Sequence, residues 1–320
     1  MANKEAFYEI AGIPVVLRGQ EDHLFTDEGV LTGFRTAPRE HGYEYRVEVL
    51  DSLPPVDGAL CYSDEACCVL RSGSEVVTCF GGDRPGREGV YAMSRRTPRG
   101  SRIIYRRTPF LQRVSPKQAL RCMELPHLLA VNGGILLHCA WIRWKDAAIL
   151  FTAPSGTGKS TQARLWCEYM GAELINGDRS ALRILDDQVF ACGIPMSGSS
   201  EVRKNETMPL RAIVYLSQAP ENRIQRLGGV RAFRRLWEGC TVPVWDRRDM
   251  ELSADTLSGV VSRVGVYHLS CRPDREAVAL LADTLEEIRC WKENRRSRFC
   301  RGISMNRAPG RDCPSAAILN

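Results

Sequence analysis

Short apolar runs between polar turns predict strands over the first third of the chain. Residues 13–17, 43–50, 67–70 and 76–80 alternate between apolar and polar positions or run apolar. Glycine, serine and aspartate clusters at 72–74 and 81–83 favour turns between them. We therefore expect a β-rich module over residues 1–113, in which we find no motif that carries chemistry.

The remainder mixes strand and helix patterns. A helix is expected over 115–129, and a hairpin of two apolar strands over 135–142 and 147–152. Further strands are expected at 172–178, 181–185, 189–191, 211–216 and 265–271, and helices at 230–239, 254–264 and 274–291. This order predicts an α/β domain over 114–292, followed by a basic, disordered tail over 293–320.

A candidate phosphate-binding loop, Ala-Pro-Ser-Gly-Thr-Gly-Lys-Ser at 153–160, lies between the strand at 147–152 and a helix. Gly156 and Gly158 allow consecutive N–H groups to turn toward phosphate oxygens. Lys159 is expected to reach the β- and γ-phosphates, and the hydroxyl of Ser160 to hold Mg²⁺. The candidate nucleotide-binding residues are Ser155, Gly156, Thr157, Gly158, Lys159, Ser160 and Thr161. The first glycine of the general pattern is replaced by Ala153.

Three further residues are candidates for the chemistry. Asp178, at the end of the next strand, can hold the metal or accept a proton from a hydroxyl, or it can simply cap a turn. His138 can lie at the phosphates if the predicted hairpin brings it there, or be an ordinary core histidine. Arg203, beside Lys204 in a polar loop at 197–205, can stabilise transferring phosphate, or belong to a plain surface loop.

Composition excludes several classes of protein. Hydrophobic residues make up 44% and charged residues 26% of the 320 residues, which is typical of a globular protein. No apolar run is long enough for a membrane span and the N-terminus lacks a secretion signal, so we expect a cytoplasmic protein without a membrane partner. Arginines crowd 95–107 and 295–301, but no nucleic-acid-binding motif accompanies them, and no specific nucleic acid is expected. The thirteen cysteines lack the spacing of a zinc site and are expected to be reduced thiols.

Several of these segments together resemble a known family. His-Cys-Ala-Trp at 138–141, the strand that follows, the loop at 155–160 and Asn-Gly-Asp at 176–178 are similar to the C-terminal kinase domain of HPr kinase/phosphorylase. That family shares its nucleotide site with the ATP-dependent phosphoenolpyruvate carboxykinases, and the resemblance covers residues 130–290. It implies an HPr kinase-like α/β nucleotide-binding domain and serine kinase activity. In that family's scheme Asp178 would be the catalytic acid, His138 the phosphate-site histidine, Lys159 the loop lysine and Ser160 the metal-binding hydroxyl.

The chain also departs from the family pattern. Gly177-Asp178 stands where the family has two adjacent acids, and Thr161 where it has an acid after the loop serine. One metal ligand is then missing, so the resemblance does not imply reversible phosphorolysis. The N-terminal module differs too, so phosphorylation of HPr itself is not implied. The chain is more similar to divergent HPr kinase-related proteins, some of which resemble kinases encoded with peptide-modifying systems.

The expected function is an ATP-dependent kinase that uses Mg²⁺ and transfers the γ-phosphate to a hydroxyl. The acceptor is a serine of a peptide or protein, or a small hydroxylated molecule. Two alternatives stay open: a nucleotide-binding regulatory protein without catalysis, and an ordinary small-molecule kinase. The sequence also leaves open whether the chain forms a homo-oligomer.

Overall fold

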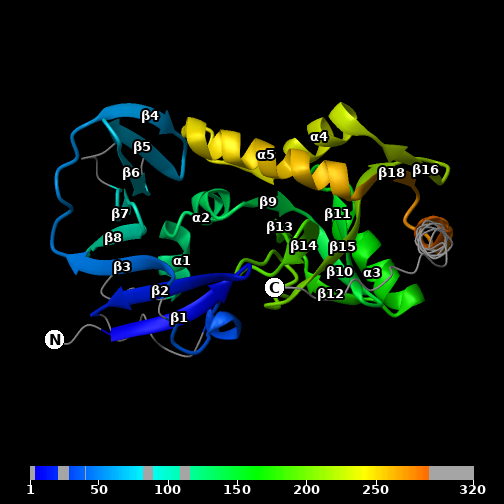
Figure 1. Ribbon diagram of the computed structural model, residues 1–320, viewed down its shortest axis with the longest axis horizontal. Coiled ribbons are helices and arrows are strands. Elements are labelled where there is room, and N and C mark those ends of the chain that lie inside the picture. Colours follow the sequence, from blue (N-terminus) through cyan, green and yellow to red (C-terminus); the bar gives the residue numbers. More distant parts are fainter. Residues whose placement is uncertain (1–3, 21–28, 40, 82–88, 109–115, 288–320) are drawn as a thin grey trace, which may run out of the picture.

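The chain folds into two large mixed sheets with helices between and around them, an α/β architecture (Figure 1). The computed structural model describes residues 4–20, 29–39, 41–81, 89–108 and 116–287, and the tail expected to be disordered at 293–320 lies outside them. The first sheet is built from the N-terminal part of the chain and the second from residues after 133.

The N-terminal sheet has eight strands in the order β1-β2-β3-β8-β7-β6-β5-β4. Its strands are β1 Lys4–Ile10, β2 Ile13–Gly19, β3 Tyr43–Leu50, β4 Ala59–Ser63, β5 Cys67–Ser72, β6 Glu75–Phe80, β7 Ala92–Thr97 and β8 Gly100–Arg106. A short 3-10 turn, Thr32–Phe34, packs on β1. Neighbours pair antiparallel except at β3, which runs parallel to both β2 and β8. The strands predicted at 13–17, 43–50, 67–70 and 76–80 all lie within observed strands.

The C-terminal sheet is divided around one long strand, β15 Thr207–Gln218. Its first residues pair antiparallel with β14, whereas the remainder pairs in parallel with β11 and β18. The other strands are β9 Gly134–His138, β10 Ala140–Trp144, β11 Ala147–Thr152, β12 Glu173–Asn176, β13 Arg179–Leu185, β14 Gln188–Cys192, β16 Arg223–Leu227, β17 Cys240–Thr241 and β18 Gly265–Cys271. The carboxyl ends of the parallel strands β11, β15 and β18 therefore share one edge.

The strand expected over 135–142 is two strands that belong to different halves of this sheet. β10 forms the predicted hairpin with β11, but β9 pairs with β13 and β17 instead. The division falls at Cys139, whose N–H donates to the carbonyl of Asp178 at 2.9 Å. The hairpin therefore does not position His138, which ends β9 opposite Arg179, the first residue of β13.

The helix expected over 115–129 is also divided. It forms α1 Pro116–Cys122 and α2 Leu125–Val131, separated at Glu124, which adopts a left-handed φ of 46°. The other helices are α3 Lys159–Met170, α4 Gly229–Trp237, α5 Arg247–Arg263 and a last helix at 275–287. α5 begins earlier than expected because the side chain of Asp246 caps it, accepting from the N–H of Asp249 at 3.2 Å.

The two sheets share a continuous core. One hydrophobic cluster contains residues of the N-terminal sheet, of α1 and α2, and of β9, β13 and β14. Hydroxyl groups of Tyr45 and Tyr105 donate to carbonyls of Met123 and Gln118, both at 2.6 Å, which fixes the two short helices against β3 and β8. The helices α1 and α2 consequently lie between the sheets (Figure 1).

The arginine-rich segment at 95–107 is largely ion-paired. Arg102 pairs with Glu48 at 2.6 Å, and Arg95 with Glu75 at 2.9 Å. Arg96 is buried among carboxylates of α2 and α5. In the described part of the chain, no helix is both long and apolar enough to cross a membrane.

Candidate functional site

The candidate phosphate-binding loop turns the chain from β11 into α3. Gly156 and Gly158 have left-handed φ values of 77° and 115°, and no atom lies within 4 Å of where a methyl group at either would stand. Backbone conformation rather than crowding therefore requires glycine at both positions. Gly158 is the N-cap of α3, so the positive end of this helix faces the loop.

Lys159 lies inside the loop. Its side chain is buried, and Nζ donates to the carbonyls of Ala153 at 3.0 Å and Pro154 at 3.3 Å. Burial lowers the pKa of Lys159 below its ordinary value, while the nearby thiol of Cys139 and carboxylate of Asp178 act to raise it. These two hydrogen bonds therefore hold Lys159 at the loop in the protein without ligand.

The hydroxyl-bearing residues of the loop differ in exposure. Ser155 and Ser160 are exposed, whereas Thr157 and Thr161 are half-buried. Thr157 donates its backbone N–H to the carbonyl of Pro154 at 3.4 Å, which tightens the turn. Ser160 thus presents its hydroxyl at the first turn of α3.

Asp178 is positioned by a turn that Asn176 stabilises. Oδ1 of the fully buried Asn176 accepts from the N–H groups of Asp178 at 2.9 Å and Arg179 at 3.0 Å, and its Nδ2 donates to the carbonyl of Met196 at 2.7 Å. A side chain at Gly177 would collide with Oγ of Ser200. A second acid at that position, as in the family pattern, would require the exposed side chain of Ser200 to move.

His138 meets Asp178 across the pairing of β9 with β13. Nε2 of His138 lies 3.5 Å from Oδ1 of Asp178, and both side chains are partly exposed. Burial is the largest cause that lowers the pKa of His138, the charge of Lys159 lowers it further, and Asp178 acts to raise it. His138 is therefore neutral at neutral pH. The hydroxyl of Thr152, at the end of β11, donates to the backbone carbonyl of His138 at 2.9 Å.

Arg179 is a site residue that the sequence did not indicate. Its Nε donates to Oδ2 of Asp178 at 3.0 Å, and its Nη1 to the hydroxyl of Thr241 on β17 at 2.7 Å. The carboxylate of Asp178 is thus held between a histidine and an arginine. Only the long-range pairing of β9 with β13 and β17 brings these groups together, and local sequence carries no signal of it.

The loop at 197–205 folds over Asp178. A methyl group at Gly198 would stand 3.1 Å from Cβ of Asp178. Arg203 lies in this loop, where Nη1 donates to Oγ of Ser197 at 3.2 Å and to the carbonyl of Glu201 at 3.1 Å. Lys204 instead pairs with Glu173. Of the two cations considered from the sequence, Arg203 is the one that faces a pocket.

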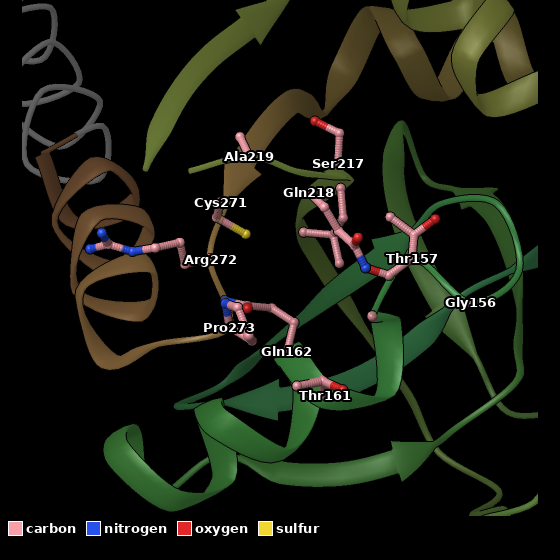
Figure 2. A pocket seen from close by; sticks show the side chains of 12 residues that line it. Gly156, Thr157, Thr161, Gln162, Ser217, Gln218, Ala219, Cys271, Arg272 and Pro273 are labelled. Atoms are coloured by element: carbon pink, nitrogen blue, oxygen red, sulfur yellow. The ribbon is translucent and has the colours of Figure 1, made fainter. Parts of the chain in front are cut away.

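A pocket of about 590 Å³ opens on one side of the phosphate loop, and we call it the loop pocket (Figure 2). Its walls are the loop and first turn of α3, the ends of β15 and β18, and the turn after β18. The residues that line it are Gly156, Thr157, Gly158, Thr161, Gln162, Leu216, Ser217, Gln218, Ala219, Cys271, Arg272 and Pro273. Gln162 is buried, and its Nε2 has no hydrogen-bond partner within the described structure.

A larger pocket of about 750 Å³ is lined by Arg179 and Gly198, which adjoin Asp178, and we call it the second pocket. It shares no lining residue with the loop pocket. The residues that line it are Val30, Leu120, Arg121, Glu124, Leu125, Pro126, Leu136, Arg179, Pro195, Met196, Ser197, Gly198, Glu201, Arg203 and Thr241. The predicted loop thus lines the first pocket, and Asp178 lies beside two residues of the second, Arg179 and Gly198.

Metal-binding groups are sparse around the site. Within the described ranges, no three residues among histidine, cysteine, aspartate and glutamate form a metal-binding group. All ten cysteines in those ranges are free thiols, and burial raises the pKa of Cys240 to about 12. A divalent cation would have to be held by the hydroxyl of Ser160 and the carboxylate of Asp178 together with ligand oxygens.

Comparisons with known proteins give a distant likeness. No family model matches the chain, and no curated protein matches it. Among solved structures, it is similar to the Hpr(Ser) kinase/phosphatase from Coxiella burnetii, with a TM-score of 0.29 and 13% identity, over 53% of this chain and 98% of that one. The function proposed below stands on the residues of the site and not on this likeness.

Proposed function

We propose that this chain is an ATP-dependent phosphotransferase that moves the γ-phosphate of ATP to a hydroxyl group. The observation that carries the proposal is the position of Lys159 and its loop beside the contact between His138 and Asp178. Transfer to a hydroxyl needs a site that holds phosphates next to a group that orients or deprotonates the acceptor. The resemblance of segments 138–160 and 176–178 to HPr kinase/phosphorylase supports the same chemistry.

The loop pocket fits a nucleotide. Gln162 lines it, and Nε2 of this buried side chain, which has no partner within the described structure, would donate to an acceptor atom of the base or ribose after the side chain turns toward the pocket. Backbone N–H groups at the start of α3 would hold the phosphates. Lys159 would exchange the carbonyls of Ala153 and Pro154 for phosphate oxygens.

The donor set also fits Mg²⁺, although it is small. This ion prefers oxygen ligands and keeps several waters, so one hydroxyl and one carboxylate suffice when phosphate oxygens complete its shell. Ser160 and Asp178 are the residues that would hold it. When bound, Mg²⁺ would neutralise charge on the phosphates.

In the proposed reaction, Asp178 accepts the proton of the acceptor hydroxyl while that oxygen bonds to the γ-phosphorus. The bond from the γ-phosphorus to the bridging oxygen breaks, and ADP leaves with that oxygen. The neutral His138 orients Oδ1 of Asp178, and Arg179 orients Oδ2. The acceptor is a peptide, a protein or a small hydroxylated molecule.

One observation favours a second candidate function. Both oxygens of Asp178 already have a neighbour, Arg179 at Oδ2 and His138 at Oδ1, which leaves less room for an acceptor hydroxyl to bind there. A chain whose acid stays bound to Arg179 would bind the nucleotide without transferring phosphate. This second function is a nucleotide-dependent regulatory protein.

The test is transfer of label from γ-labelled ATP, with Mg²⁺, into small molecules and proteins of a cell extract. Wild type is compared with Lys159→Ala, and with Lys145→Ala in an exposed hairpin turn as the matched control. Transfer that is lost only in Lys159→Ala supports the kinase. ATP binding that depends on Lys159, without transfer to any fraction, supports the regulatory protein. Failure of wild type to bind ATP contradicts both.

A further inference from the structure

The second pocket adjoins the proposed catalytic carboxylate through two of its lining residues. Arg179 lines it and donates to Asp178, and Gly198 lines it within contact distance of Asp178. A molecule in this pocket would therefore lie close to Asp178. That position suits an acceptor, whose hydroxyl has to reach both this carboxylate and the γ-phosphate.

Backbone strain is concentrated at this pocket. In the described ranges, six residues other than glycine have a left-handed φ. Four of them, Ala11, Lys145, Asp186 and Asp187, lie in tight turns between adjacent antiparallel strands, where this conformation is ordinary. The other two, Glu124 and Glu201, both line the second pocket. Strain retained outside such turns is common at ligand-binding sites.

The pocket also holds arginines that no carboxylate neutralises. Among the described residues, Arg203 donates only to a hydroxyl and a carbonyl, and Arg121 contacts the phenol of Tyr91. Glu124 is bound by Arg96, which Asp246 and Asp249 share, and Asp178 is paired with Arg179. The residues that line the pocket include three arginines and two glutamates. The pocket as a whole favours an anion.

Most of the remaining lining is apolar. Leu120 and Leu125 come from α1 and α2, Leu136 from β9 and Met196 from the segment after β14. A cavity of about 750 Å³ accommodates a small molecule or one to two amino-acid residues rather than a folded surface. The ligand that fits is short, with an anionic group beside an apolar part.

We propose, as an extension of the kinase function above, that the second pocket binds the phosphate acceptor, and that this acceptor carries a carboxylate group close to its reactive hydroxyl. Arg203 and Arg121 bind the carboxylate, and the apolar wall contacts the rest of the acceptor. The same chemistry occurs in a free hydroxy acid and in a peptide segment with an acidic residue beside a serine.

The experiment blocks carboxylate groups chemically, and it does not require the acceptor to be identified beforehand. A cell extract is separated into a small-solute fraction and a fraction of peptides and proteins. Half of each is treated with carbodiimide and methylamine, which convert carboxylates to neutral amides. Transfer of γ-label by wild type is expected to fall in the treated half of whichever fraction holds the acceptor, and that fraction identifies a free acid or a peptide.

Two variants tie the effect to the pocket. Arg203→Gln and Arg121→Gln should each lower transfer to the untreated acceptor by roughly 10- to 100-fold, the loss of one charge-assisted hydrogen bond. Transfer by the variants should also depend less on amidation than transfer by wild type. Arg234→Gln, an exposed arginine on α4, is the matched control.

The outcomes separate this inference from the proposed function. Equal transfer to treated and untreated fractions would leave the kinase standing and overturn the carboxylate requirement. Variants that keep the full preference for untreated acceptor would overturn the assignment of the two arginines. ATP binding, measured on every variant by calorimetry, distinguishes a lost acceptor site from a misfolded chain. Absence of transfer to either fraction by wild type would overturn both proposals.

Discussion

Oδ1 of Asp178 lies 3.5 Å from Nε2 of His138 because β9 and β13 pair directly at the point where one ends and the other begins. The distance is set by a sheet register and not by a flexible loop. Two groups held in this way keep their relative positions when one side chain is changed. Substitutions at either position therefore report on chemistry more than on folding.

Asp178→Asn keeps the shape of the side chain and removes its charge. We expect ATP binding to persist and phosphate transfer to fall by about 10²- to 10⁴-fold, the usual contribution of a general base. Single-turnover transfer from γ-labelled ATP measures this. Asp187→Asn, an exposed carboxylate in the turn between β13 and β14, should transfer at the wild-type rate. Transfer by Asp178→Asn at the rate of the control would rule out Asp178 as the base.

The pKa of His138 predicts an acid limb in the pH profile. Burial and the charge of Lys159 lower this pKa below the ordinary value of 6.5, so the neutral imidazole persists at neutral pH and is protonated only below that value. A protonated His138 would form an ion pair with Asp178. The carboxylate would then be occupied by the imidazolium and could not accept the proton of the acceptor hydroxyl. We expect kcat/KM to be constant above pH 6.5 and to fall below it.

The control for this limb is His138→Asn, which cannot titrate. Its kcat/KM should be lower at neutral pH and should stay level to a lower pH than that of wild type. An acid limb at the same pH in both proteins would show that another group titrates there.

Gln162→Leu removes the buried amide that has no partner in the described structure. Because an unpartnered buried donor costs free energy, the melting temperature of the free protein should stay the same or rise. Affinity for ATP should fall by roughly 3- to 10-fold, the loss of one neutral hydrogen bond. Calorimetry and thermal unfolding measure the two effects, and Gln188→Leu, at the exposed first residue of β14, is the control. Unchanged ATP affinity would show that Gln162 does not contact the nucleotide.

The loop and Asp178 could be recognised from sequence because their signals are local. Glycines at fixed spacing, a preceding apolar strand and an acid at the end of the next strand need no knowledge of distant pairing. The observed strand, turn and helix at 147–170 agree with that prediction. The functions assigned to these residues stay predictions.

The other groups around Asp178 depend on contacts that no local pattern encodes. Arg179 reads as an ordinary strand residue, and only the pairing of β9 with β13 and β17 places it against Asp178 and Thr241. His138 reaches the same point through that pairing, and not through the hairpin that the sequence suggested. The second pocket forms between the C-terminal sheet and the helices α1 and α2, next to the helical break at Glu124, and Glu124 is not a residue type that predicts such a break.

Arg96 offers a test of how the two sheets are held together. Its side chain is 9% exposed, and it lies 2.9 Å from Glu124 before α2 and 3.1 Å from Asp249 in α5. Those two carboxylates are 8% and 2% exposed, so neither can recover its hydration if the arginine is removed. The arginine-rich segment at 95–107 thus includes Arg96, a buried residue that connects β7 to two helices.

Arg96→Leu should lower the free energy of unfolding by about 3–5 kcal/mol, the cost of leaving buried charges without their partner. Arg102→Leu is the matched control, because the pair of Arg102 with Glu48 is largely exposed to solvent, and it should cost less than about 1 kcal/mol. Urea unfolding of both variants at neutral pH measures the difference. Similar losses for the two arginines would mean that the buried cluster contributes no more than a surface pair, and that the shared apolar core alone holds the sheets together.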